Sequence, residues 1–238
     1  MVGRLSPLDR LEELPHPGDV VVRRSSGEQA AMYIRRLIFD GVLREGDRVP
    51  QDAIAEQLGL SRVPVREALL SLEREGWVTI KPHRGAFIGA LDESVVRDHY
   101  ELYGHVYSFA ARRAAQRRSP ELLAKLTDLQ SQIAALDDAQ AAWRLNRDFH
   151  NTIVEMARSP RLQSVLRAMA GIVPGNFFAL VPGSIDVEKR GTAAILQAIQ
   201  DGDADKVAEE YVAMMSQQGD LVVELFRSRG ILPAEEAG

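Results

Sequence analysis

Two arginines near the start of one expected helix have the chemistry needed to read a DNA duplex. Arg62 and Arg66 stand four residues apart, so their side chains project from the same face of a helix. A guanidinium group can donate two hydrogen bonds at once, to O6 and N7 of guanine. The N-terminus of a helix also attracts phosphate. Two arginines on an arbitrary helix are usually solvated surface charges, so the surrounding elements decide between the two interpretations.

The apolar pattern around this pair predicts a helix-turn-helix. Helices are expected from Ser26 to near Gly41, from Pro50 to Gly59, and from Ser61, as the N-cap, to Gly76. The inward stripe of the third helix is Val65, Ala68, Leu69 and Leu72. This stripe leaves Arg62 and Arg66 on the opposite, solvent-facing side. Pro64 lacks an N–H group, which costs nothing in the first turn of a helix.

A β-hairpin is expected directly after the third helix. The apolar runs 77–80 and 86–88 flank the turn KPHRG, with Gly85 at its tip. Lys81, His83 and Arg84 in this turn are suited to contact phosphates or the minor groove. Taken alone, these three residues fit an ordinary charged turn equally well.

The remainder of the chain, from Asp92 onward, has helical periodicity. Breaks fall at 119–120, 137–138, 159–160, 182–183 and 202–203, which predicts about six helices and hence a bundle. The predicted fold class is mainly α: an N-terminal winged helix-turn-helix followed by an all-α helical bundle. The expected domain limits are a flexible arm at 1–25, or a short ordered helix there, the winged domain at 26–90, the helical domain at 91–229 and a disordered tail at 230–238.

Composition narrows the classes of function. The chain has no cysteine, which excludes disulfides, thiolate metal sites and cysteine nucleophiles. No apolar run approaches the roughly 18 residues of a membrane span, so we expect a cytoplasmic protein with no membrane partner. Residues 26–90 hold nine basic and nine acidic side chains, whereas residues 91–238 hold sixteen and twenty-one and carry the whole net charge of −5. Nucleic-acid contact must therefore come from a local basic face in the first half.

The stretch 43–88, LREGDRVPQDAIAEQLGLSRVPVREALLSLEREGWVTIKPHRGAFI, resembles the DNA-binding domain of the GntR family. The resemblance extends over residues 27–90 and implies a winged helix-turn-helix dimer on double-stranded DNA with a palindromic operator. The DNA contacts that it implies are Ser61, Arg62, Val63, Pro64, Arg66, Lys81, His83, Arg84 and Gly85. Asp52 stands where the family has a basic DNA-contacting residue, so we expect no direct contact there and a different operator sequence.

Residues 92–228 resemble the FadR-type C-terminal domain, the FCD domain, through HYELYGHVYSFAARRAA, LNRDFHNTIVEMARSPRL and AAILQAIQDGDADKVAEEYVAMM. The resemblance implies a bundle whose central cavity holds an organic ligand and, in many members, a divalent metal on one acidic or amide residue and three histidines. Here Asn146 and His150 occupy the first two positions, but Thr192 and Met214 occupy the others. We therefore expect no metal or other cofactor, since His150 alone leaves a degenerate site with weak affinity for a divalent ion.

The family's ligand-anchoring arginine and glutamate align with Tyr103 and Tyr107. The implied effector-binding residues are Tyr103, Tyr107, Asn146, His150, Thr192 and Met214. Such a cavity is neutral and largely apolar, which favours an acyl-CoA or a lipid or aromatic catabolite over a simple hydroxy acid. By residue type alone, the tyrosines, His150 and Met214 fit ordinary core positions as well.

These features predict a ligand-responsive, homodimeric DNA-binding transcription regulator with a small organic effector, a repressor in preference to an activator. The alternative is a DNA-binding regulator whose helical half only dimerises. An enzyme that uses His150 as a general base is disfavoured, because Asp148 lies on a different helix face and no nucleophile motif or carboxylate–histidine arrangement is recognisable.

Overall fold

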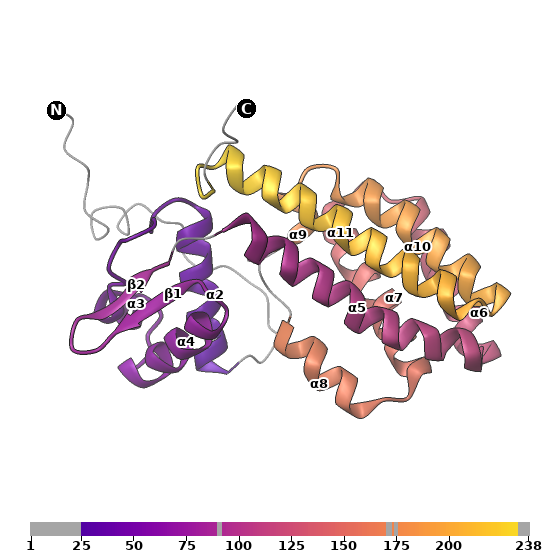
Figure 1. The fold of residues 1–238 in the computed structure, drawn as a ribbon, viewed down its shortest axis with the longest axis horizontal. Coiled ribbons are helices and arrows are strands. Elements are labelled where there is room, and N and C mark those ends of the chain that lie inside the picture. Colours follow the sequence, from indigo (N-terminus) through magenta and orange to yellow (C-terminus); the bar gives the residue numbers. More distant parts are fainter. Residues whose placement is uncertain (1–24, 90–91, 170–172, 174–175, 233–238) are drawn as a thin grey trace. The chain divides into compact units, whose positions relative to one another are not determined.

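The computed structural model of the chain describes residues 25–89, 92–169, 173 and 176–232. It divides into two compact units (Figure 1). Of the described residues, 25–89, 92, 173 and 226–232 belong to the N-terminal unit, and 93–169 and 176–225 belong to the helical unit. The predicted arm, except for Ser25, and the last six residues of the predicted tail lie outside the described residues.

Three helices form the core of the N-terminal unit: α2 (Ser26–Phe39), α3 (Gln51–Gln57) and α4 (Arg62–Arg74). A capping box starts α2, in which the Ser25 hydroxyl accepts a hydrogen bond from the N–H of Glu28 and the Glu28 carboxylate accepts one from the N–H of Ser25. Helices α2 and α4 pack against each other. The predicted inward stripe of α4 is confirmed, because all four of its residues are buried.

A β-hairpin, the wing, follows α4. Strands β1 (Val78–Lys81) and β2 (Gly85–Ile88) pair antiparallel, and the segment before α3 adds a bridge between Arg48 and Phe87. The hairpin prediction is confirmed, but the placement of Gly85 at the tip is wrong. His83 lies in the turn with a left-handed φ of 58°, whereas Gly85 begins β2. Gly85 has a φ of 102°, which side-chain-bearing residues rarely adopt, so the backbone favours glycine there, and a Cβ would also stand 3.0 Å from the Nε atom of Arg48.

The last turn of α11 (Ala204–Ser228) completes the core of the N-terminal unit. The ring of Phe226 packs edge-on against Phe39 and Trp77, with centroid distances of 5.8 and 6.3 Å. All three rings are buried. The place of Phe226 in this core does not follow from the sequence, because periodicity indicates which face of a helix is apolar but not what that face packs against.

The helical unit consists of seven helices among the described residues, where about six were expected. They are α5 (Glu93–Arg117), α6 (Pro120–Ala134), α7 (Ala139–Ala157), α8 (Pro160–Met169), α9 (Phe177–Leu180), α10 (Ser184–Asp201) and most of α11. All five predicted breaks fall at helix boundaries, and α9, with four residues, is the helix that periodicity did not indicate. No described helix is long and apolar enough to span a bilayer.

Close approach of helices characterises the core of this unit. Helix α7 packs against α5, α6 and α10. At the crossing of α10 with α11, a Cβ added to Gly191 would clash with the side chain of Met214. The absence of a side chain at Gly191 therefore lets Met214 fill the space between the two helices, where it is 2% exposed.

Candidate DNA-binding surface and buried polar cluster

The first turn of α4 presents its arginines to solvent. Arg62 and Arg66 are exposed, while Val65 on the same turn is fully buried, so the predicted outward placement of the pair is confirmed. Val63 is also exposed. Ser61 occupies the N-cap position, as predicted, but its side chain makes no capping hydrogen bond. The N-terminal N–H groups of α4 therefore keep their capacity to bind an anion.

Arg62 is held in an ion pair that was not predicted from the sequence. Its Nε lies 2.6 Å from Oδ1 of Asp52, in the first turn of α3. Both side chains are more than 70% exposed, so the pair contributes at most about 1 kcal/mol and a phosphate can compete for the arginine. Arg66 has no ion-pair partner within the described part of the chain. The pair joins the first turns of α3 and α4, so it depends on how these two helices cross, which periodicity does not indicate.

A groove of about 970 Å³ lies between α3, α4 and the wing. Its basic lining residues are Arg48, Arg62, Arg66, Lys81 and His83. Five of the nine predicted DNA-contact residues line it: Arg62, Arg66, Lys81, His83 and Gly85. The remaining four, Ser61, Val63, Pro64 and Arg84, lie beside the groove on α4 or in the wing turn. Arg48 was not predicted, because its place beside the groove depends on the bridge to β2.

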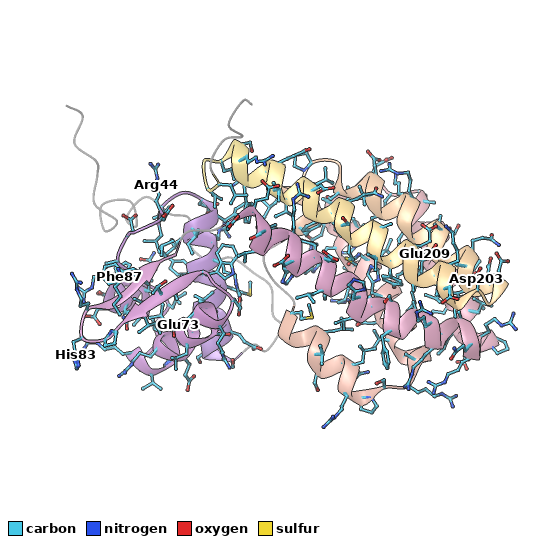
Figure 2. All side chains as sticks on the ribbon, in the orientation of Figure 1. Arg44, Glu73, His83, Phe87, Asp203 and Glu209 are labelled. Atoms are coloured by element: carbon cyan, nitrogen blue, oxygen red, sulfur yellow. The ribbon has the colours of Figure 1, made fainter. Side chains whose placement is uncertain are left out.

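The wing turn carries its basic groups outward. His83 lies at the tip of the hairpin (Figure 2), and Lys81, His83 and Arg84 are all exposed. The N–H of Arg84 donates to the carbonyl oxygen of Lys81 at 3.0 Å, which fixes the turn. The ammonium of Lys81 lies 4.9 Å from the centroid of the Phe87 ring. The tip can therefore present cationic groups from a defined backbone.

A buried polar cluster lies in the helical unit. His150 on α7 is 4% exposed, and its Nδ1 lies 2.9 Å from the hydroxyl of Tyr211 on α11. Its Nε2 lies 3.4 Å from Oε1 of Glu188 on α10, which is 3% exposed. Neither Nε2 nor Oε1 has a hydrogen-bond partner. The prediction that the chain lacks a carboxylate–histidine arrangement is therefore wrong: Glu188 supplies the carboxylate and lies one helical turn before Thr192.

Tyrosine rings border this cluster. Tyr107 stacks on Tyr211, with centroids 5.4 Å apart and planes 7° apart, and its centroid lies 5.0 Å from that of His150. The hydroxyls of Tyr103 and Tyr107 are 3.4 Å apart. Burial raises the pKa of Tyr107 and of Tyr211 well above the ordinary value, and it raises the pKa of Tyr103 as well. All three phenols are therefore neutral at physiological pH.

The structure brings together some of the predicted effector residues and not others. Tyr103, Tyr107 and His150 lie in direct contact. The Thr192 hydroxyl is turned to its own helix, where it donates to the carbonyl oxygen of Glu188 at 2.7 Å. Met214 is packed at Gly191, and Asn146 is half-buried on α7.

The donors in this cluster do not fit a tightly bound divalent metal. His150 and Glu188 offer one nitrogen and one carboxylate. The hydroxyl of Thr192 is engaged with its own helix, and a methionine thioether at 214 is a soft ligand. Within the described ranges, no three histidine or carboxylate side chains converge as a metal site would require.

Comparison with known proteins decides the family. Residues 26–88 match the family model described as bacterial regulatory proteins, gntR family, and residues 98–217 match the FCD domain. The chain belongs to the GntR family. This GntR protein is 31% identical over 215 residues to the uncharacterised HTH-type transcriptional regulator Rv0043c of Mycobacterium tuberculosis, covering 88% of this chain and 86% of that protein. It is also 31% identical over 129 residues to the Nta operon transcriptional regulator of Aminobacter aminovorans. This match covers 53% of this chain and 61% of that protein.

Solved structures of regulators share the fold of this GntR protein. McbR/YncC of E. coli aligns with a TM-score of 0.57 at 20% identity, over 86% of this chain and 99% of that one. A GntR family member from Pseudomonas syringae aligns with a TM-score of 0.53 at 21% identity, over 94% of this chain and 96% of that one. The predicted fold class and family are confirmed. The GntR protein is thus a DNA-binding transcription regulator with an FCD domain and not an enzyme.

Proposed function

We propose that this DNA-binding regulator reads a palindromic operator as a homodimer and represses transcription until an organic effector binds its helical unit. The observation that carries the DNA-reading part is the outward placement of Arg62 and Arg66 above a buried stripe, beside a groove shared with a basic wing. Two such helices in a dimer would enter successive major grooves, about 34 Å apart.

Each part of this surface has a distinct role in the proposal. Arg66 donates to a guanine, and Arg62 exchanges Asp52 for a phosphate or a base edge. The exposed side chain of Val63 is suited to contact a thymine methyl group. Ser61 and Pro64 shape the N-terminus of α4, where phosphate binds. The wing residues Lys81, His83, Arg84 and Gly85 lie along the backbone or the minor groove.

The experiment is a titration of Arg66→Ala against a duplex that the wild-type chain has selected from a random library. Loss of a bidentate contact of about 1–3 kcal/mol predicts roughly 5- to 150-fold weaker specific binding per site. Arg74→Ala is the matched control, because it removes the same exposed charge from the last turn of the same helix. Equal affinities of the two variants would contradict the role of Arg66.

For the helical unit, we propose an effector that lies against Tyr103, Tyr107, Asn146 and His150 and donates a hydrogen bond to Glu188. The orphaned Oε1 of Glu188 supports a ligand donor at this point. A buried carboxylate disfavours an anionic group beside it, so a lipid or aromatic catabolite with an N–H or O–H group fits better than the charged part of an acyl-CoA. Thr192 on α10 and Met214 on α11 border the cluster. The few possible metal ligands, His150 and Glu188, support an effector site without a metal.

Thermal unfolding of the full chain tests this effector. We expect amides or alcohols of aromatic and fatty acids to stabilise the wild-type protein, by about 2.7 kcal/mol at 100 times the Kd, and the parent carboxylates to have no effect. In Glu188→Gln, we expect the amides and the parent carboxylates to stabilise the protein equally. The reverse preference, for carboxylates in the wild type, would contradict the assignment.

One observation favours the second candidate, a helical unit that only dimerises. Tyr107 stacks directly on Tyr211, and Met214 fills the space at Gly191, so side chains occupy much of the region where an effector would lie. If no member of the ligand panel shifts the unfolding temperature, this second function is the better one.

A further inference from the structure

Gln218 on α11 is a buried polar side chain with only half of its amide paired. It is 3% exposed, and its Nε2 donates to the carbonyl oxygen of Ser184 at 3.1 Å. This bond fixes the orientation of the amide, because a carbonyl oxygen can pair only with the N–H side. The Oε1 atom is left without a hydrogen-bond partner in the described part of the chain. A buried acceptor of this kind is costly, so a donor from outside the chain is needed there.

This orphaned acceptor lies one helical turn from the effector cluster. Among the described residues of the helical unit, three buried side-chain atoms lack a hydrogen-bond partner: Oε1 of Gln218, Oε1 of Glu188 and Nε2 of His150. Glu188 lies beside His150, and Ser184, which holds Gln218, precedes Glu188 by four residues on α10, a rise of about 6 Å. The two orphaned oxygens therefore belong to neighbouring turns of the contact between α10 and α11.

Aromatic rings on α5 connect these two ends. A Cβ added to Gly219, the residue after the orphaned amide, would stand 2.9 Å from the Cβ of Tyr100, so α5 lies directly against α11 there. Tyr103 and Tyr107 follow Tyr100 on the same face of α5, and their ring centroids are 4.9 Å apart. The ring of Tyr107 then reaches that of His150. A flat apolar molecule can pack along such a row of rings.

We propose that Gln218 forms a second polar end of the effector site, and that the effector carries two hydrogen-bond donors. One donor pairs with Oε1 of Gln218 and the other with the carboxylate of Glu188. This inference rests on the proposed effector site and narrows its ligand to molecules with an O–H or N–H group at each end of a short aromatic or apolar body. Phenolic alcohols, diols and hydroxy amides belong to this class, whereas a carboxylate at either end would face an acceptor oxygen.

Calorimetric titration of the wild-type chain tests the requirement for two donors. The probes are para-hydroxybenzyl alcohol, which has two hydroxyl groups, and para-cresol and benzyl alcohol, which each keep one of them. Hexanediol and hexanol form a second, aliphatic pair. We expect each compound with one donor to bind at least about fivefold more weakly than its parent diol, because one buried acceptor then stays unpaired.

A substitution at Gln218 assigns one of the two donors to its acceptor. Gln218→Met keeps the length of the side chain and removes the acceptor, so we expect para-hydroxybenzyl alcohol to lose its advantage over one of the two aromatic probes and to keep it over the other, through Glu188. Gln217→Met is the matched control, because it removes the same amide from an exposed neighbouring position on α11. It should bind every probe as the wild type does. Circular dichroism verifies the fold of both variants.

The outcomes separate this inference from the effector site on which it rests. Wild-type affinities that do not increase with the second donor, as when a water molecule satisfies Gln218, would overturn the second polar end and leave an effector with one donor at Glu188. Retention of both preferences in Gln218→Met would do the same. If neither diol binds, this inference is wrong, and if the amides and alcohols of the unfolding panel also have no effect, the effector site is wrong as well. The wild-type comparison decides the question even if Gln218→Met fails to fold.

Discussion

Asp52 and Arg62 illustrate how one residue can alter a DNA-binding surface without touching DNA. The family resemblance implies a basic residue at position 52, and the carboxylate found there instead holds Arg62 in an exposed ion pair. Before Arg62 can bind the duplex, this pair must open. The cost is small because the pair is exposed, but the carboxylate also repels nearby phosphates.

Replacing Asp52 by Asn should therefore tighten DNA binding. The change removes a negative charge next to the groove and frees Arg62, so we expect a higher affinity and a salt dependence steeper by about one counterion. Fluorescence anisotropy at several salt concentrations measures both quantities. Glu56→Gln, on the same helix and also lining the groove, is the control for the loss of charge alone. A weaker affinity for Asp52→Asn would show that Asp52 itself contributes a contact, and an unchanged affinity would show that the ion pair does not restrain Arg62.

The buried tyrosines predict a loss of stability in alkali. Burial raises the pKa of Tyr107 in the folded chain above its unfolded value, which is near 10. The stabilising effect of the neutral phenol is complete below pH 10 and is lost as the pH rises through the folded pKa. Tyr107→Phe should therefore lose less stability than the wild type between pH 9 and about pH 10.5. Urea unfolding at the two pH values measures the difference, and an equal loss in both proteins would contradict it.

At the scale of elements, the contact of α10 with α11 depends on the missing side chain at Gly191. Gly191→Ala should destabilise the protein by about 1–3 kcal/mol, even though alanine is the better helix former, because its Cβ would displace Met214. The loss should shrink in a Met214→Ala background, where the new methyl group has room. A double-mutant cycle by urea denaturation measures this coupling, and strictly additive effects would argue against the contact.

Elements that depend on local patterns could be predicted from the sequence, and those that depend on tertiary contacts could not. The stripe of α4 and the strands of the wing follow from periodicity and turn residues. Gly85 was expected at the tip of the wing turn, whereas His83 lies there with a left-handed φ and Gly85 begins β2. Nothing local marks Phe226 as part of the N-terminal core.

The candidate sites divide in the same way. The arginine pair could be found from its spacing, because both residues lie on one helix. The cluster around His150 combines α7, α10 and α11. The family resemblance points to Thr192, whereas the buried carboxylate beside His150 belongs to Glu188, one helical turn earlier. Residue type was a sufficient signal, since a carboxylate in the middle of an apolar helix face is rarely buried without a purpose.

At the scale of the whole molecule, the two halves of the chain differ in charge. Four of the nine lysines and arginines of residues 26–90 line one groove, while the sequence from residue 91 onward carries the net charge of −5. The acidic part disfavours indiscriminate binding to DNA, so affinity depends on the few contacts made by α4 and the wing. If an effector couples to operator binding by about 1–3 kcal/mol, operator DNA must by linkage change effector affinity by the same 5- to 150-fold.

Methylation interference at guanine N7 tests the central claim, that the first turn of α4 reads bases in the major groove. With the wild-type chain, methylation of particular guanines in each half-site should exclude the duplex from the complex. With Arg66→Ala, at a salt concentration low enough to restore binding, interference should disappear at one guanine per half-site and persist elsewhere. An interference pattern identical to that of the wild type would contradict the account.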